Sequence, residues 1–224
     1  MSETKVVKSH KASGRPEDSI NFITFALFAV LSFVGLVFLL LKTLPSGAGE
    51  CAPVAIFGVL TVTVFTVGAF AHAPLRAGKL ERFFGHADRC FVCVLALAAM
   101  TPVMIVCASR GNNSDGVWLY TLYAVACACT VTAVAVNIAD IAECKLTSLL
   151  LYVTVACAFA ARADLIVAYC GMDCLLFLIG GFLSYFVATV VTAFGGMPAR
   201  HTLRHLFTGV GAALHYVCIF TFLL

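Results

Sequence analysis

Residues 20–41 read INFITFALFAVLSFVGLVFLLL, a stretch of 22 residues without a charged side chain. As an α-helix this stretch would be about 33 Å long, enough to cross the roughly 30 Å hydrocarbon core of a membrane. A signal peptide has a shorter apolar core of about 7–15 residues behind a basic leader. Residues 1–19 instead carry acidic as well as basic side chains. The stretch therefore predicts a membrane-spanning helix.

The whole chain shares this apolar character. Of its 224 residues, 62% are apolar and 11% are charged, against about 45–50% and 25% in ordinary globular proteins. So few polar side chains cannot cover a water-facing surface, and lipid must surround most of the chain. This composition excludes a soluble enzyme, a disordered chain and a nucleic-acid-binding protein.

Six further apolar runs follow the first, separated by short segments rich in glycine, proline and charge. They are Ala52–Ala73, Asp88–Ser109, Val117–Asn137, Leu146–Ala161, Cys174–Phe194 and Leu203–Phe222. None shows the alternation of a transmembrane β-strand, so we expect helices. The fifth run is the shortest and can extend through Arg162 and Asp164 toward Tyr169. The sequence thus predicts an all-α, multi-pass integral membrane protein with a polar tail (1–19) and one seven-helix membrane domain (20–224).

The distribution of lysine and arginine predicts the orientation of these helices. With seven spans, 11 of the 14 basic residues fall on the side of the amino-terminal tail, and only Lys42, Arg110 and Arg162 fall on the other. The eleven are Lys5, Lys8, Lys11, Arg15, Arg76, Lys79, Arg82, Arg89, Lys145, Arg200 and Arg204. Basic residues concentrate in cytoplasmic loops. We therefore predict a cytoplasmic amino terminus and an outside carboxyl terminus, the reverse of G-protein-coupled receptors.

The eleven cysteines do not indicate a metal knuckle or a disulfide scaffold. Most lie inside the apolar runs, where cysteine acts as a small hydrophobic residue. The pairs Cys90–Cys93 and Cys170–Cys174 lack the second pair or histidine partner of a zinc knuckle. We expect packing roles for all of them.

Four ionisable residues lie at the ends of predicted spans. His72 ends the second, Asp88 begins the third, and His201 and His205 begin the seventh. In the predicted orientation, all four fall at one level on the cytoplasmic side. Ionisable groups at membrane depth are costly and indicate functional sites.

These residue types suit a zinc site. His201 and His205 are four residues apart, so both imidazoles lie on one face of a helix. With His72 as a third ligand, zinc would keep an open position for water, as catalytic zinc does. Asp88 would then accept a proton from that water or orient it. The alternative is that these histidines are merely interfacial, beside Arg200 and Arg204.

Motifs along most of the chain resemble one family of membrane proteins. They are Glu17–Thr24, Arg82-x-Phe84-x3-Asp88, Met100–Pro102, Gly180–Tyr185 and His201-x3-His205-Leu206-Phe207-x7-His215-Tyr216. In order and spacing they are similar to the hemolysin III branch of the progestin and adiponectin receptor family, within a superfamily that includes alkaline ceramidases.

The resemblance implies seven helices, a cytoplasmic amino terminus, and zinc held by His72, His201 and His205 with Asp88 near the zinc-bound water. It also implies lipid binding in the helical bundle and hydrolysis of ceramide-like amides. His215 matches a further family histidine. Because it lies roughly 15 Å deeper than His205, we expect it to hydrogen-bond inside the bundle.

The chain departs from the family pattern beside the predicted metal. Gly68 stands four residues before His72, where the family usually has serine, and the family's Thr-His in the first span is Thr24-Phe25 here. Thr66 lies on the wrong face of the helix to replace that serine. The three predicted ligands remain, so the departure bears on hydrolysis more than on metal binding.

Two functions follow from these patterns. The first is a zinc-dependent hydrolase of lipid amides, with Asp88 as the catalytic base and membrane lipids as substrates. The alternative is a non-catalytic lipid sensor, receptor or cytolysin in which zinc is structural. A protein side chain in the fourth position of the metal would favour the alternative.

Overall fold

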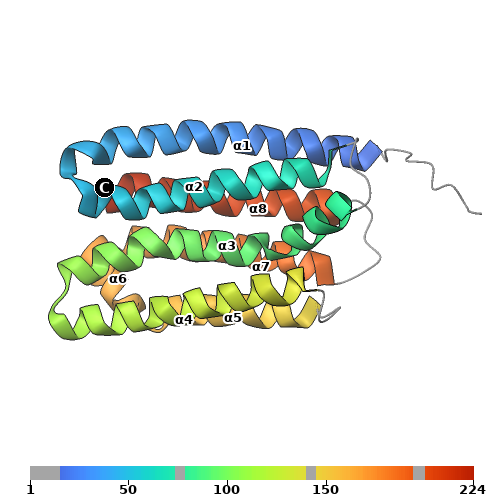
Figure 1. Cartoon of the computed structure of the whole chain (residues 1–224). Coiled ribbons are helices and arrows are strands. Elements are labelled where there is room, and N and C mark those ends of the chain that lie inside the picture. Colours follow the sequence, from blue (N-terminus) through green and yellow to red (C-terminus); the bar gives the residue numbers. More distant parts are fainter. Residues whose placement is uncertain (1–15, 74–78, 140–144, 194–199) are drawn as a thin grey trace, which may run out of the picture.

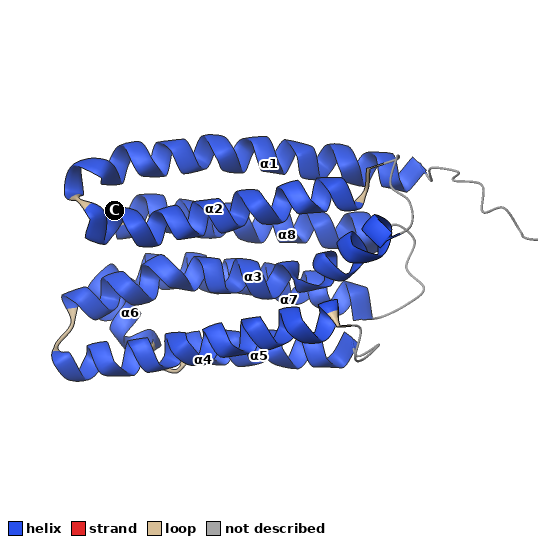
Figure 2. Cartoon of the chain, viewed as in Figure 1, coloured by secondary structure: helices blue, strands red, loops and turns tan. Residues whose placement is uncertain are grey.

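A computed structural model describes residues 16–73, 79–139, 145–193 and 200–224, and these residues form helices joined by short turns (Figures 1 and 2). The helices are α1 (Pro16–Thr43), α2 (Ala48–Ala71), α3 (Lys79–Arg110), α4 (Asn113–Ile138), α5 (Lys145–Ala160), α6 (Ala163–Cys170), α7 (Met172–Ala193) and α8 (Arg200–Cys218). A 3-10 turn (Leu44–Ser46) follows α1, and a π-helical turn (Ile219–Leu223) extends α8. The described residues contain no strand, which confirms the predicted all-α fold.

Among the described residues, six helices are long and apolar enough to cross a membrane. A seventh crossing exists if α5 and α6, which meet at an angle of 52°, form one bent span. The 16 residues of α5 measure only about 24 Å, less than the roughly 30 Å that a span requires. The protein is therefore a multi-pass integral membrane protein with six or seven candidate spans, and the continuation of its fifth span past Arg162 into α6 stays a prediction.

Charged side chains mark the bend between α5 and α6. Arg162 lies between the two helices, and its guanidinium contacts Asp115 of α4 at 3.3 Å and Asp164 of α6 at 3.1 Å. A break in a membrane helix leaves backbone groups that other polar groups must satisfy. This small ionic network holds the bend against the start of α4.

Helix α3 lies at the centre of the bundle. It packs against α2, α4, α5, α6, α7 and α8, and most of its apolar side chains are buried. Helix α1 lies at the edge, where it packs against α2 and α8 and exposes side chains such as Ile23, Val30 and Phe33. Large exposed apolar side chains are what a lipid-facing helix presents. The central place of α3 brings Asp88, near its first turns, close to both α2 and α8.

The start of α1 and the carboxyl terminus lie at opposite ends of the bundle (Figure 1). Seven crossings, with α5 and α6 counted as one, would place them so. Which end faces the cytoplasm stays a prediction. Lys5, Lys8, Lys11, Arg15, Arg76 and the predicted connection at Pro198 lie outside the described residues.

Two glycines let α7 and α8 approach closely. Gly181 of α7 faces the ring of His215, and Gly211 of α8 faces the ring of Tyr185, so each helix offers one aromatic ring to a glycine of the other. A Cβ atom at Gly181 would lie 2.2 Å from Nε2 of His215, and one at Gly211 would lie 2.4 Å from Cε1 of Tyr185. His215 is fully buried, and its Nε2 lies 3.3 Å from the carbonyl oxygen of Leu178. The expectation that His215 hydrogen-bonds inside the bundle is confirmed.

The neighbouring glycines Gly180 and Gly181 give a matched test of this packing. We expect Gly181→Ala to lower the free energy of unfolding by about 1–3 kcal/mol, the usual cost of overpacking a core. A Cβ atom at Gly180 meets nothing closer than Leu214 Cδ1 at 3.5 Å. Gly180→Ala should therefore leave the thermal midpoint of the detergent-solubilised protein unchanged or slightly raised. Equal losses in both variants would contradict the proposed ring-to-glycine fit.

Candidate metal site

His72 lies at the end of α2, where its sequence position predicted it. It is the residue that caps the helix, and its backbone N–H donates to the carbonyl oxygens of Ala69 and Phe70. Pro74 follows two residues later, and the residue before a proline disfavours helical geometry, so the chain leaves the helix here. The imidazole is buried, and its Nδ1 lies 3.7 Å from Oδ1 of Asp18 in α1.

Asp88 lies in α3, two residues before the apolar span Cys90–Arg110. Its carboxylate forms an ion pair with Arg204 of α8, and both side chains are largely buried. Burial by itself raises the pKa of Asp88, but the charge and the hydrogen bond of Arg204 outweigh it and bring the pKa below its ordinary value of 3.8. The carboxylate is therefore ionised at neutral pH and able to bind a cation.

His205 lies in the second turn of α8, and only 1% of its surface is exposed. Its Nε2 is buried and finds no hydrogen-bond partner among the described residues, and the same is true of Oδ1 of Asp88. A buried polar atom without a partner costs about 1–3 kcal/mol. A cation bound between these two atoms would satisfy both.

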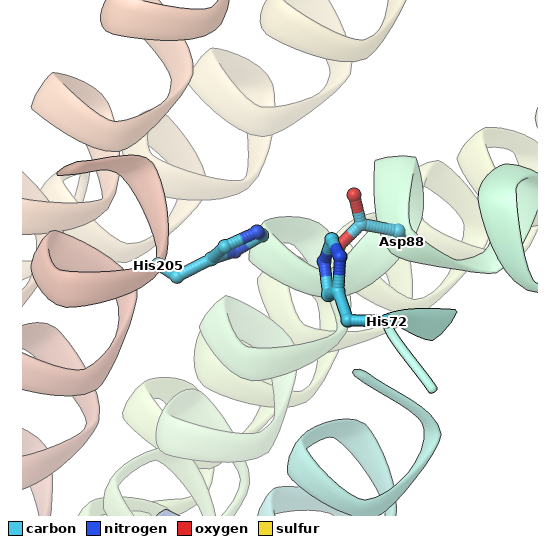
Figure 3. Close-up of side chains that lie close together, drawn as sticks. All are labelled: His72, Asp88 and His205. Carbon is cyan, nitrogen blue, oxygen red and sulfur yellow. The ribbon is translucent and has the colours of Figure 1, made fainter. Parts of the chain in front are cut away.

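His72, Asp88 and His205 come together at one end of the bundle although they belong to α2, α3 and α8 (Figure 3). One ligand atom from each lies within 4.8 Å of the others, and the two imidazole rings are 4.9 Å apart between centroids. Two ligands about 2.1 Å from one ion are at most about 4.2 Å apart, so small side-chain movements suffice to hold a zinc ion. Two imidazoles and a carboxylate suit zinc and other borderline divalent metals.

His201 is not part of this three-residue group. It lies in the first turn of α8, one turn before His205, and its side chain is exposed. The structure thus brings Asp88, rather than His201, within ligand distance of His72 and His205. The role of His201 as a metal ligand stays a prediction.

Phe25 of α1 fills the space beside the group. Its ring is fully buried and lies 4.4 Å from the ring of His205 and 5.7 Å from the ring of His72, between centroids. A Cβ atom at Gly68 would lie 2.5 Å from Cδ1 and Cε1 of Phe25. The two departures from the family pattern therefore form one feature, because the phenyl ring occupies the space that a serine side chain at position 68 would need.

The sequence patterns did not reveal the partners of three residues at the site. Arg204 indicated only orientation and an interfacial position, yet its place beside His205 and level with Asp88 was a usable signal for a buried ion pair. Phe25 and Gly68 were each noted as unusual, but nothing in the sequence showed that they touch.

The fold and the site together define a class: a multi-pass helical membrane protein with a His–Asp–His group at one end of its bundle. Residues 14–216 of the chain match the family model described as haemolysin-III related. The chain therefore belongs to the haemolysin-III related family, as its motifs suggested, and the match includes all four predicted site residues. None of the curated proteins that were compared matches the chain.

Proposed function

We propose that the protein binds zinc between His72 and His205 and hydrolyses the amide bond of a membrane lipid there, with Asp88 beside the metal. The observation that carries the proposal is the meeting of two imidazoles and an ionised carboxylate within 4.8 Å, drawn from three separate helices. Family membership and the two buried atoms without partners support a metal at this place.

The third protein ligand is either Asp88 or His201. The geometry favours Asp88, because its carboxylate already lies in the group, whereas the family resemblance implies His201. Either set supplies three protein ligands, which is the number that catalytic zinc sites use. Zinc in such a site acidifies water to a pKa of about 7 and polarises a carbonyl.

The residues of the chain prepare the site for an anionic transition state. Arg204 holds the Asp88 carboxylate in place and adds a positive charge that favours a developing oxyanion. If His201 is the third ligand, the Asp88 carboxylate is left to accept a proton from the attacking water or to orient it. Asp88 lies two residues before one apolar span, and His205 lies near the start of another, Arg200–Leu223. The site is thus near the membrane boundary, where the headgroup-proximal amide of a lipid would lie.

We expect Asp88→Asn to lower the turnover of a ceramide panel at least about a hundredfold, the usual contribution of a proton-transferring residue. Asparagine keeps the size of the side chain and one acceptor for Arg204, so the fold should survive. The metal content of the same sample identifies the ligand set. If metal is retained, the third ligand is His201; if it is lost, the third ligand is Asp88. Unchanged turnover would refute the catalytic role of Asp88.

A second candidate function is a non-catalytic lipid sensor with structural zinc. The packing of Phe25 over both histidines, together with the missing hydroxyl at Gly68, favours it. Two measurements on purified protein with a full complement of zinc test this alternative. Binding of a lipid amide in a fluorescence or calorimetric titration, without any turnover of it, would support the sensor over the hydrolase.

A further inference from the structure

A pair of thiols lies at the end of the bundle opposite the metal site. Cys107 is near the end of α3 and Cys170 is the last residue of α6, and their Sγ atoms are 3.4 Å apart. Cys107 is 19 positions after Asp88 on the same helix, about 28 Å along its axis. The pair is therefore separate from the candidate metal site.

Polar contacts that do not involve the thiols hold this pair together. The guanidinium of Arg110, one turn after Cys107, donates to the carbonyl oxygens of Tyr169 and Leu223, each at 3.1 Å. The hydroxyl of Tyr169 donates to Oδ2 of Asp115 at 3.1 Å. The ends of α3, α4 and α6 are thus fixed to one another, and the two sulfur atoms stay close whether or not they are bonded.

The two thiols differ in access to solvent. Cys107 is fully buried, whereas Cys170 is only partly buried and precedes three exposed residues, Gly171 at the end of α6 and Met172 and Asp173 at the start of α7. A second thiol pair lies nearby: the Sγ atoms of Cys174 and Cys218 are 3.3 Å apart, but both side chains are fully buried. Among the described residues, one of these two thiol pairs therefore includes a partly exposed sulfur and the other is shielded, and the thiol of Cys170 also contacts that of Cys174.

We propose that Cys107 and Cys170 form a disulfide by exchange with a low-molecular-weight disulfide, while Cys174 and Cys218 stay reduced. The Cys170 thiolate attacks one sulfur of the reagent, which releases one small thiol and leaves a mixed disulfide on Cys170. The Cys107 sulfur then attacks Cys170, the protein disulfide forms, and a second small thiol leaves. Two electrons and two protons pass from the protein thiols to the reagent. In the predicted orientation this end faces the outside, where disulfides persist.

Exposing the reduced, detergent-solubilised full chain to oxidised glutathione tests the proposal. We expect two of the eleven thiols to be lost, with one cross-linked peptide joining Cys107 to Cys170 in mass spectrometry. The thermal midpoint should rise by roughly 5–10 °C, because the bond constrains the unfolded chain. A cross-link between Cys174 and Cys218 ahead of this one would overturn the assignment.

Single replacements by serine separate exchange from simple packing. Cys107→Ser should stop the reaction between these two thiols, so that Cys170 carries a glutathione or is cross-linked to Cys174, whose thiol it also contacts. Cys170→Ser should leave Cys107 unmodified, because Cys107 is shielded from solvent. Cys157→Ser changes an exposed thiol on α5 and should leave the cross-link intact. An unmodified Cys170 in the Cys107→Ser variant, under conditions that modify other cysteines, would refute the proposal.

Discussion

Replacing His205 by alanine is expected to lower the zinc bound to the purified protein from about one ion per chain to less than about a tenth. His205 supplies a buried imidazole nitrogen that finds no partner among the described residues, and it belongs to both candidate ligand sets. Changes in the outer shell of a metal site cost about 10–100-fold in affinity, and loss of a direct ligand costs more. Metal content by atomic absorption, with size-exclusion chromatography to confirm folding, measures the effect.

Two further variants make this test specific. His205→Gln keeps most of the side-chain volume and should lose zinc as alanine does, which separates ligand loss from a packing defect. His201→Ala removes an exposed side chain and should retain zinc if His72, Asp88 and His205 form the set. Full zinc content in both His205 variants would mean that zinc is bound elsewhere.

The second large effect concerns the contact between Phe25 and Gly68. Gly68→Ser places a Cβ atom about where the phenyl ring of Phe25 lies, and we expect a loss of about 1–3 kcal/mol in the free energy of unfolding. Phe25→Ala empties a fully buried site and should cost about 3–5 kcal/mol. Because each change relieves part of the other's defect, the double variant should be more stable than the sum of the two predicts, by at least about 1 kcal/mol.

Thermal unfolding of the four proteins in one detergent measures this coupling. The matched control combines Phe25→Ala with Gly180→Ala, whose Cβ atom has room and whose effect should simply add. If the stability losses of Phe25→Ala and Gly68→Ser simply add in the double variant, the two residues do not compete for one space. If the hydrolase proposal holds, the double variant Phe25→Ala/Gly68→Ser also returns a hydroxyl to the metal site and should turn over lipid amide faster than the Gly68→Ser variant.

The sequence by itself determined that lipid surrounds the protein and at which depth in the membrane its candidate site lies. Length and hydropathy are local properties, so residues 20–41 predict a membrane helix without knowledge of any neighbour. Counting spans then placed His72, Asp88 and His205 at one level, because alternate connections return to the same face of a membrane. The prediction that the short fifth span continues past Arg162 followed from the same reasoning about length.

Only the tertiary structure decided which residues at that level touch. Lateral packing of α2, α3 and α8 placed Asp88, not His201, within ligand distance of the two buried histidines, and paired Asp88 with Arg204. The same packing set Phe25 against Gly68 and Cys107 against Cys170. Hydropathy fixes how deep a residue lies in the membrane, but the rotation and neighbours of each helix depend on side-chain fit among segments far apart in the chain.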